Sequence, residues 1–464
     1  MSQERPTALS VRDPGIRALF AQRARWQAWL DVEAALARAQ AEIGMIPEAA
    51  ATEIQRKAHL ELFDLERVTE GLRVTGHGLV PLVWELDRLC EGDAGGYVHW
   101  GATTQNITQT GNILQLRKAH RIVLSELADL LEALASLAER TKDHAIAGRT
   151  HGQHAVPSTF GAKVAVWIDE LCRHAQRLRQ LEPRAFVAML GGGAGTAASF
   201  QGHGAALQRR MGELLGLGSM PLPGRTIYDH LTEYVLALAM LGTSCGKAAR
   251  EVRTLMAEEF GEVEEPVPPG AVGSSTMPQK RNPKLCMDIV ADETHLRSLV
   301  PLAIEAMLGD HEADGSRSMM IDRALRQAVE LTGDILVRMQ EVTEGLRVFP
   351  ERMRQNLELS GGLIMSESLM LELGREIGRQ RAHDVIYEAA QEAATSGASF
   401  ASLLARDEEI AARLGAERLA EMLDPVRYTG DSARQASEQA ARALRVAADL
   451  REATSADRVR PPPP

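Results

Sequence analysis

Residues 121–140 read RIVLSELADLLEALASLAER, and this stretch determines the fold class. One set of its apolar side chains recurs at alternating steps of four and three: Val123, Leu127, Leu130, Leu134 and Leu137. These steps place the side chains on one stripe of an α-helix, as at the seam of a helix bundle. Since no glycine or proline occurs from about Asn112 to Arg140, we expect a helix roughly 40 Å long.

Similar long helical patterns cover four further segments, at residues 160–182, 228–260, 284–308 and 319–346. Aromatic residues make up only 4% of the chain, which is typical of helices rather than of sandwiches or barrels. Hairpin signals for an extensive sheet are absent. The sequence therefore predicts an all-α fold around an elongated bundle, and a bundle of this size tends to bury its remaining apolar faces against copies of itself.

The chain divides into three predicted helical domains. Residues 1–107 hold shorter helices and end in a glycine-containing run, whereas residues 108–347 hold the long-helix bundle. Residues 348–464 return to short helices and finish in SADRVRPPPP, a terminus without apolar periodicity that we expect to be disordered.

Composition excludes several classes of protein. A net charge of −11 and a pI near 5.7 argue against nucleic acid or an anionic membrane as partner. The four cysteines are widely spaced without a CxxC pair, so neither a disulfide framework nor a cysteine zinc site is indicated. The N-terminus lacks the apolar core of a signal peptide, and no uncharged apolar run of membrane-spanning length occurs. We expect a cytoplasmic protein.

Polar residues gather in four irregular segments, of which the first two precede helical patterns. TGHG at residues 75–78 carries His77, which could equally be a surface turn residue. VHWGATTQN at residues 98–106 ends in four uncharged polar side chains, Thr103, Thr104, Gln105 and Asn106. Such residues satisfy the free N–H groups of a helix start, and the same helix N-terminus attracts a carboxylate.

The third segment is GRTHGQHAVPSTFG at residues 148–161, where Thr150, His151 and His154 are expected on a loop or frayed turn. A neutral histidine there can donate or accept a proton near pH 7. Two histidines three residues apart could also bind zinc, but no third ligand or HExxH pattern accompanies them, so no metal is predicted.

The fourth segment, GSSTMPQKRNP at residues 273–283, contains two prolines that interrupt both helix and strand, and it is predicted to be a loop. A serine hydroxyl is a weak base unless its anionic form is stabilised. For Ser274, the loop N–H groups, Lys280 and Asn282 could provide that stabilisation. GxSxG, the P-loop and GxGxxG patterns are absent, which removes the usual support for hydrolase, nucleoside-triphosphatase and dehydrogenase functions.

GSSTMPQKRNP resembles the signature loop of the fumarase/aspartase superfamily, Gly-Ser-Ser-x-Met-Pro-x-Lys-x-Asn-Pro. The second and third segments resemble two further blocks of that superfamily, in the same order. WLDVEAALARAQAEIGMIP at residues 29–47 resembles the N-terminal region of its adenylosuccinate lyase and 3-carboxy-cis,cis-muconate cycloisomerase branch. The resemblance implies three helical domains, a homotetramer with a twenty-helix core, active sites shared by three subunits, and no cofactor.

The resemblance also implies roles for individual residues toward a di- or tricarboxylate substrate. Ser274 would be the general base, His151 the proton donor to the leaving group, and His77 a second histidine beside it. Residues implied to contact substrate are Thr103, Thr104, Gln105, Thr150, Ser275, Met277, Lys280 and Asn282, with Asn106 in place of the usual aspartate. Arg17 and Arg317 could bind an extra carboxylate as bidentate forks.

His151 distinguishes between members of the branch, because carboxymuconate cycloisomerases usually lack it. Adenylosuccinate lyase is disfavoured by a missing N-terminal Arg-Tyr pair, by Ile227 in place of a glutamine, and by Met319 and Met320 in place of Ser-Ser. The sequence therefore predicts a lyase that reversibly eliminates an amine from an N-substituted aspartate, giving fumarate through an aci-carboxylate.

The cycloisomerase, adenylosuccinate lyase itself and a non-catalytic structural member remain as alternatives. The presence of Ser274, Lys280, Asn282 and His151 together disfavours the structural member, which has no need for them. The leaving amine, the direction used in the cell, and contacts of Tyr228 and His230 with substrate stay open.

Overall fold

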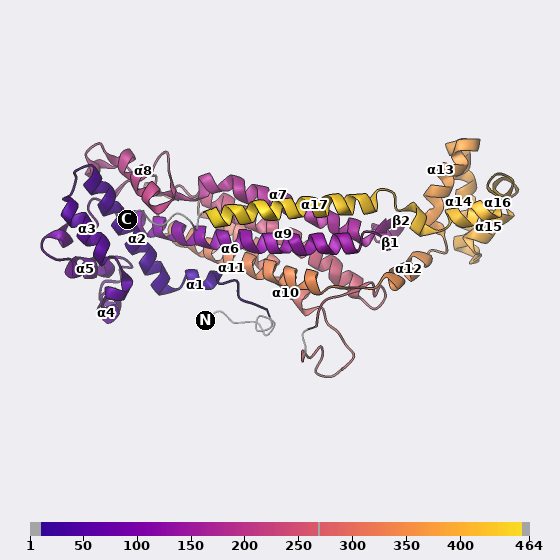
Figure 1. Ribbon diagram of the computed structural model, residues 1–464, viewed down its shortest axis with the longest axis horizontal. Helices are drawn as coiled ribbons and strands as arrows, with labels where there is room; N and C mark the ends of the chain where they lie inside the picture. Colours follow the sequence, from indigo (N-terminus) through magenta and orange to yellow (C-terminus); the bar gives the residue numbers. More distant parts are fainter. Residues whose placement is uncertain (1–10, 268–269, 457–464) are drawn as a thin grey trace.

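The computed structural model describes residues 11–267 and 270–456, so the predicted terminal tail from residue 457 on lies outside the described residues. The molecule is elongated, with long helices in the middle and shorter helices at both ends (Figure 1). Strands form only three two-stranded sheets among the described residues. The all-α prediction is therefore confirmed.

The helices, in chain order, are α1 Ile16–Leu19, α2 Gln22–Glu42, α3 Glu48–Lys57, α4 Leu65–Thr75, α5 Val80–Leu89, α6 Thr104–Arg140, α7 Phe160–Ala185, α8 Gly204–Leu215, α9 Asp229–Met256, α10 Lys284–Glu305, α11 Gly315–Gly345, α12 Pro350–Glu358, α13 Ser366–Ile377, α14 Arg379–Ser396, α15 Phe400–Arg406, α16 Glu408–Met422 and α17 Ser432–Ala456. The strands are β1 Ala145–Thr150, β2 Gln153–Thr159, β3 Val187–Ala188, β4 Gly218–Ser219, β5 Val263–Glu264 and β6 Arg347–Val348. The β1–β2 and β5–β6 pairs are antiparallel, and β3–β4 is parallel.

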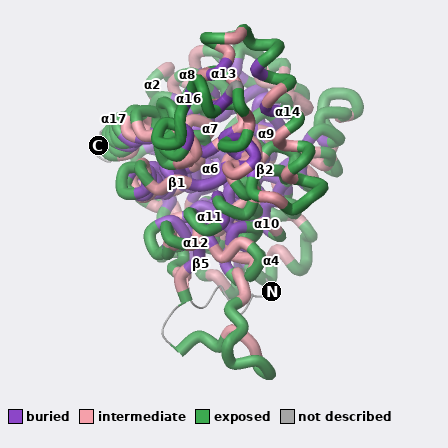
Figure 2. The backbone as a smooth tube through the Cα atoms, turned by 90° about the vertical axis from the view of Figure 1, so that its right-hand side faces the viewer, coloured by how far each residue is buried: buried purple, intermediate pink, exposed green. Residues whose placement is uncertain are grey.

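The five predicted long helices are α6, α7, α9, α10 and α11, and they form the central bundle. Helix α6 has 37 residues and begins at Thr104, earlier than the predicted Asn112. The stripe that predicted α6 is in the core, since each of its five side chains is at most 1% exposed. Seen along the bundle, buried positions gather in the middle and exposed positions lie outside (Figure 2).

Helix α17 also belongs to the bundle, although the sequence-based division grouped residues 432–456 with the C-terminal unit. It packs along α6 and α7 (Figure 1). Its buried positions form a stripe of small side chains with one leucine at the end: Ala436, Ala440, Ala443, Ala447 and Leu450. Alanine lets helices approach closely, but such a stripe does not say which helix it packs against.

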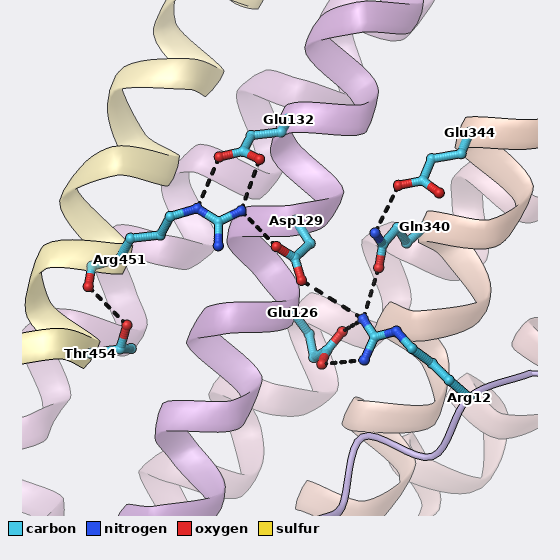
Figure 3. A network of polar contacts seen from close by, with 8 residues as sticks. All are labelled: Arg12, Glu126, Asp129, Glu132, Gln340, Glu344, Arg451 and Thr454. Atoms are coloured by element: carbon cyan, nitrogen blue, oxygen red, sulfur yellow. Dashed lines mark hydrogen bonds and ion pairs between the residues drawn. The ribbon is translucent and has the colours of Figure 1, made fainter. Parts of the chain in front are cut away.

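A polar network on the bundle surface ties α17 and the N-terminal segment to α6 (Figure 3). Arg451 of α17 donates to Glu132 at 3.0 and 2.8 Å and to Asp129 at 2.6 Å. Arg12 pairs with Glu126 of α6 and donates to Gln340 of α11 at 2.9 Å. Because all of these groups except Glu126 are partly exposed, each pair contributes little alone, and the pairs count mainly as a network.

The two ends of the molecule differ in how they join the bundle. At one end, α2 packs against α3, α6 and α8, and its buried side chains continue the bundle core. At the other end, α13–α16 surround a separate apolar core that includes Leu369, Leu373, Phe400 and Leu404. No helix among the described residues is long and apolar enough to cross a membrane.

Strands β1 and β2 form a hairpin where the sequence predicted a loop or frayed turn. The turn residues His151 and Gly152 have φ of 52° and 79°. Positive φ at both central residues is characteristic of the type I′ turns that join two strands tightly. This region of the prediction was wrong because a His-Gly pair is a weak signal for such a turn.

Candidate active site

His77 and Thr104, from separate sequence segments, lie together at the α2–α5 end. His77 follows α4, and its Nδ1 accepts hydrogen bonds from the backbone N–H groups of Leu79 (3.3 Å) and Val80 (3.1 Å). In the neutral ring the proton is therefore on Nε2, which lies 3.3 Å from the Thr104 hydroxyl. His77 thus donates to Thr104 Oγ1 and leaves the Thr104 O–H free to donate to a ligand.

Asn106 has no free polar atom to offer at this end. Its Oδ1 accepts from the N–H groups of Thr103 (3.1 Å) and Gly192 (3.0 Å), and its Nδ2 donates to Met189 Sδ at 2.9 Å. The side chain is fully buried. Asn106 therefore caps the start of α6 and holds the glycine-rich segment against it.

Gln105 faces the chain segment before α9. Its Nε2 donates to the Arg225 carbonyl at 2.7 Å and to the Tyr228 hydroxyl at 3.0 Å, while Arg225 Nε donates to its Oε1 at 3.0 Å. Burial raises the pKa of Tyr228, which keeps its hydroxyl protonated near neutral pH. Sequence reasoning missed Arg225, which lies in no motif.

A small cavity of about 80 Å³ lies beside Gln105. Its lining combines apolar side chains such as Phe20 with polar ones such as Asn112 and Asp322.

His230, near the start of α9, is 9% exposed, and its Nε2 has no hydrogen-bond partner among the described residues. Burial lowers the pKa of His230, so the ring is neutral near pH 7.

At the opposite end, the β1–β2 hairpin exposes Thr150 and His151 at its tip. Arg149, two residues before His151, forms a two-pronged ion pair with the buried carboxylate of Glu262. His154 pairs with Arg149 across the hairpin, and burial, followed by the Arg149 charge, lowers the pKa of His154. His154 is thus neutral near pH 7.

The segment at residues 270–283 has neither helix nor strand, which confirms the predicted loop. Ser274 Oγ accepts hydrogen bonds from the backbone N–H groups of Thr276 (3.3 Å) and Met277 (3.1 Å). Two N–H donors stabilise negative charge on the oxygen and so favour its basic form.

Two side chains at the end of this loop bind backbone carbonyls at its start and so close its base. Asn282 Nδ2 donates to the Gly273 carbonyl at 2.9 Å, and Lys284 Nζ donates to the Val272 carbonyl at 2.5 Å. The predicted contact residues Ser275, Met277 and Lys280 are exposed.

The two arginines predicted to bind an extra carboxylate are both paired within the chain. Arg17 donates to Asp334 of α11 at 3.0 Å, and Arg317 donates to Glu305 at 2.7 Å. Within the described residues, no group of three or more His, Cys, Asp or Glu side chains could hold a metal ion.

A single chain does not bring all of the predicted site residues together. Thr104 begins α6 and the hairpin follows its end, so the two lie roughly 50 Å apart for a 37-residue helix. Figure 1 shows the hairpin at the opposite end of the bundle from α2–α5, with residues 270–283, which precede α10, projecting from the side.

Comparisons with known proteins agree with these features. A family model described as "Lyase" matches residues 8–290, and one described as "Adenylosuccinate lyase C-terminus" matches residues 362–439. Adenylosuccinate lyase of Methanothermobacter thermautotrophicus is 40% identical, covering 92% of this chain and 96% of the relative. N-acetyl-S-(2-succino)cysteine lyase of Enterococcus italicus is 36% identical, over 89% and 91% respectively.

Cycloisomerases are similar as well. The 3-carboxy-cis,cis-muconate cycloisomerase of Pseudomonas aeruginosa is 38% identical over 90% of this chain and 92% of its own length. A crystal structure of fumarate lyase from Mesorhizobium sp. BNC1 superposes with a TM-score of 0.86 at 34% identity, covering 92% of this chain and 98% of that one. The chain therefore belongs to the fumarase/aspartase superfamily and is a lyase of that superfamily.

Proposed function

We propose that the protein reversibly eliminates an amine from an N-substituted aspartate and releases fumarate, with Ser274 as general base and His151 as general acid. The observation that carries this proposal is the pair of backbone N–H groups that donate to Ser274 Oγ inside the signature loop. Two relatives, the adenylosuccinate lyase and the N-acetyl-S-(2-succino)cysteine lyase, are named for substrates that carry a succinyl group.

In this mechanism, Ser274 takes a proton from the carbon next to one carboxylate, and the electron pair moves onto that carboxylate as an aci-carboxylate. This doubly charged group needs fixed donors, because a carbon next to a carboxylate is a weak acid. Lys280 and the N-terminus of α6, with Thr103 and Thr104, are proposed to supply them. The electron pair then forms the double bond of fumarate, the carbon–nitrogen bond breaks, and His151 protonates the leaving nitrogen.

His77 is proposed to orient the carboxylate site. Because its Nε2–H donates to Thr104 Oγ1, the Thr104 hydroxyl hydrogen points elsewhere and can donate to a substrate carboxylate. Gln105 binds Arg225 and Tyr228 and so holds the segment before α9 beside this site.

We further propose a homotetramer in which three subunits complete each active site. Support comes from the separation of Thr104 and His151 along α6. The bundle also exposes large apolar side chains from three helices: Val166 of α7 at 55%, Met240 of α9 at 45%, and Met287 and Ile304 of α10 at 50% and 49%. Exposed apolar side chains of this kind mark surfaces where a second protein packs.

A panel of substrates tests the proposed reaction. The purified protein is incubated with N-substituted aspartates, adenylosuccinate, S-(2-succino)cysteine and 3-carboxy-cis,cis-muconate, and fumarate is followed by its absorbance. We expect fumarate from at least one N-substituted aspartate. Lactonisation of carboxymuconate, with no fumarate from any aspartate, would instead establish the cycloisomerase, which the relative from Pseudomonas aeruginosa favours.

Replacing Gly273 with alanine should impair the serine loop. A Cβ at this position would lie 2.2 Å from the Lys280 carbonyl oxygen, so the two ends of the loop would have to separate. We expect kcat/KM to fall by about 100-fold, since displacements near 1 Å at reacting groups cost this much. Gly96→Ala is the control, because a Cβ there meets no atom within 4 Å. Equal kcat/KM values for both variants would contradict the prediction.

A further inference from the structure

A buried ion pair joins the two segments that carry the proposed acid and base. Arg149 of β1 donates from Nη1 to Glu262 Oε2 at 3.0 Å and from Nη2 to Oε1 at 2.6 Å. Arg149 stands two residues before His151, and Glu262 directly precedes β5, which leads into the Ser274 loop. The Glu262 side chain is fully buried and that of Arg149 is 14% exposed.

Glu262 also binds a third element. Asn356 of α12 donates from Nδ2 to Glu262 Oε1 at 2.8 Å, and the Phe349 N–H donates to the Glu262 carbonyl at 3.0 Å. The Arg149 guanidinium lies over the Phe260 ring at 4.9 Å. The carboxylate therefore connects the hairpin, the approach to β5 and α12 at one buried point.

A second carboxylate extends this connection to the serine loop. Glu264 of β5 accepts from Arg281 at 2.8 Å and from Arg347 at 3.3 Å. Arg281 lies between Lys280 and Asn282, at the end of the loop. The end of the loop is thus anchored to the strand that follows Glu262.

We infer that Glu262 is a positioning residue, which fixes the hairpin bearing His151 to the approach to β5 and to α12, and thereby sets where His151 lies in the active site that it completes. This inference rests on the proposed function. A two-pronged carboxylate–guanidinium pair sets both distance and angle, whereas a single hydrogen bond leaves the angle free. Since His151 lies at the tip of a short hairpin, its position follows from how the base of that hairpin is held.

Glu262→Gln tests the inference, because it keeps the shape but removes the charge and one acceptor for Arg149. We expect kcat to fall by about 10- to 100-fold with KM within about threefold of wild type, since substrate contacts remain. Amide hydrogen exchange should also become faster in residues 145–159. Glu293→Gln is the matched control: Glu293 is also fully buried and paired with two arginines, Arg250 and Arg297, but lies in α10.

A double variant separates positioning from stability. Each single replacement leaves a buried charge unpaired, whereas Arg149→Met with Glu262→Met removes both charges. The double variant should regain thermal stability while kcat stays low. Recovery of kcat together with stability, or wild-type kcat and exchange in Glu262→Gln, would overturn the inference. If the wild type turns over no substrate, the proposed function fails, and the exchange comparison with Glu293→Gln still decides the positioning role.

Discussion

Ser274→Ala is expected to lower kcat by at least about 1,000-fold. The loss of a general base lowers the rate by this order of magnitude, and a water molecule does not take its place at a fixed position. The assembly should be unchanged, since within the described part of the chain the Ser274 hydroxyl bonds only to the adjacent loop backbone. Steady-state fumarate release and light scattering after gel filtration measure the two quantities.

Thr276→Ala is the control for Ser274→Ala. Its backbone N–H still donates to Ser274 Oγ, and among the residues that the structure describes the lost hydroxyl has one contact, at 3.4 Å with Ser275. We expect Thr276→Ala to keep most of the activity. A Ser274→Ala protein with kcat near that of wild type would remove Ser274 from the role of base.

The long helices could be predicted from sequence because their pattern is local. The stripe from Val123 to Leu137 repeats over several turns, and α7, α9, α10 and α11 begin and end within a few residues of their predicted limits. The packing of α17 could not be predicted in the same way, since alanines at heptad spacing fit many partners. The β1–β2 hairpin was missed because its turn depends on positive φ at His151, and positive φ is uncommon for any residue other than glycine.

The candidate site could be predicted where its residues lie in short sequence motifs. Ser274 and Lys280 were found in one loop, and His77 with Thr104 were found in two segments that the structure brings together. Glu262 and Arg225 gave no signal, because their partners are distant in sequence and each looks like an ordinary charged residue. The ion pair of Arg17 could not be predicted either, because its partner Asp334 lies far along the chain on α11.

Two inactive variants should restore each other's activity when they share a tetramer. Thr104→Asp places a negative charge where a substrate carboxylate is proposed to bind, yet aspartate is well tolerated in the first turn of a helix. It should therefore fold and bind substrate poorly, whereas Thr104→Asn, of the same size without the charge, should keep more activity. Ser274→Ala lacks the base but retains the α6 terminus.

If the α6 terminus and Ser274 of one site come from different subunits, a 1:1 mixture reassociated from subunits contains sites with both segments intact. Each segment has about one chance in two of being intact, so about a quarter of wild-type activity should return. If both segments come from one chain, every site keeps a defect and no activity returns. Native mass spectrometry of the mixture shows whether mixed tetramers formed, so that inactivity in their presence would rule out the sharing of these two segments between subunits.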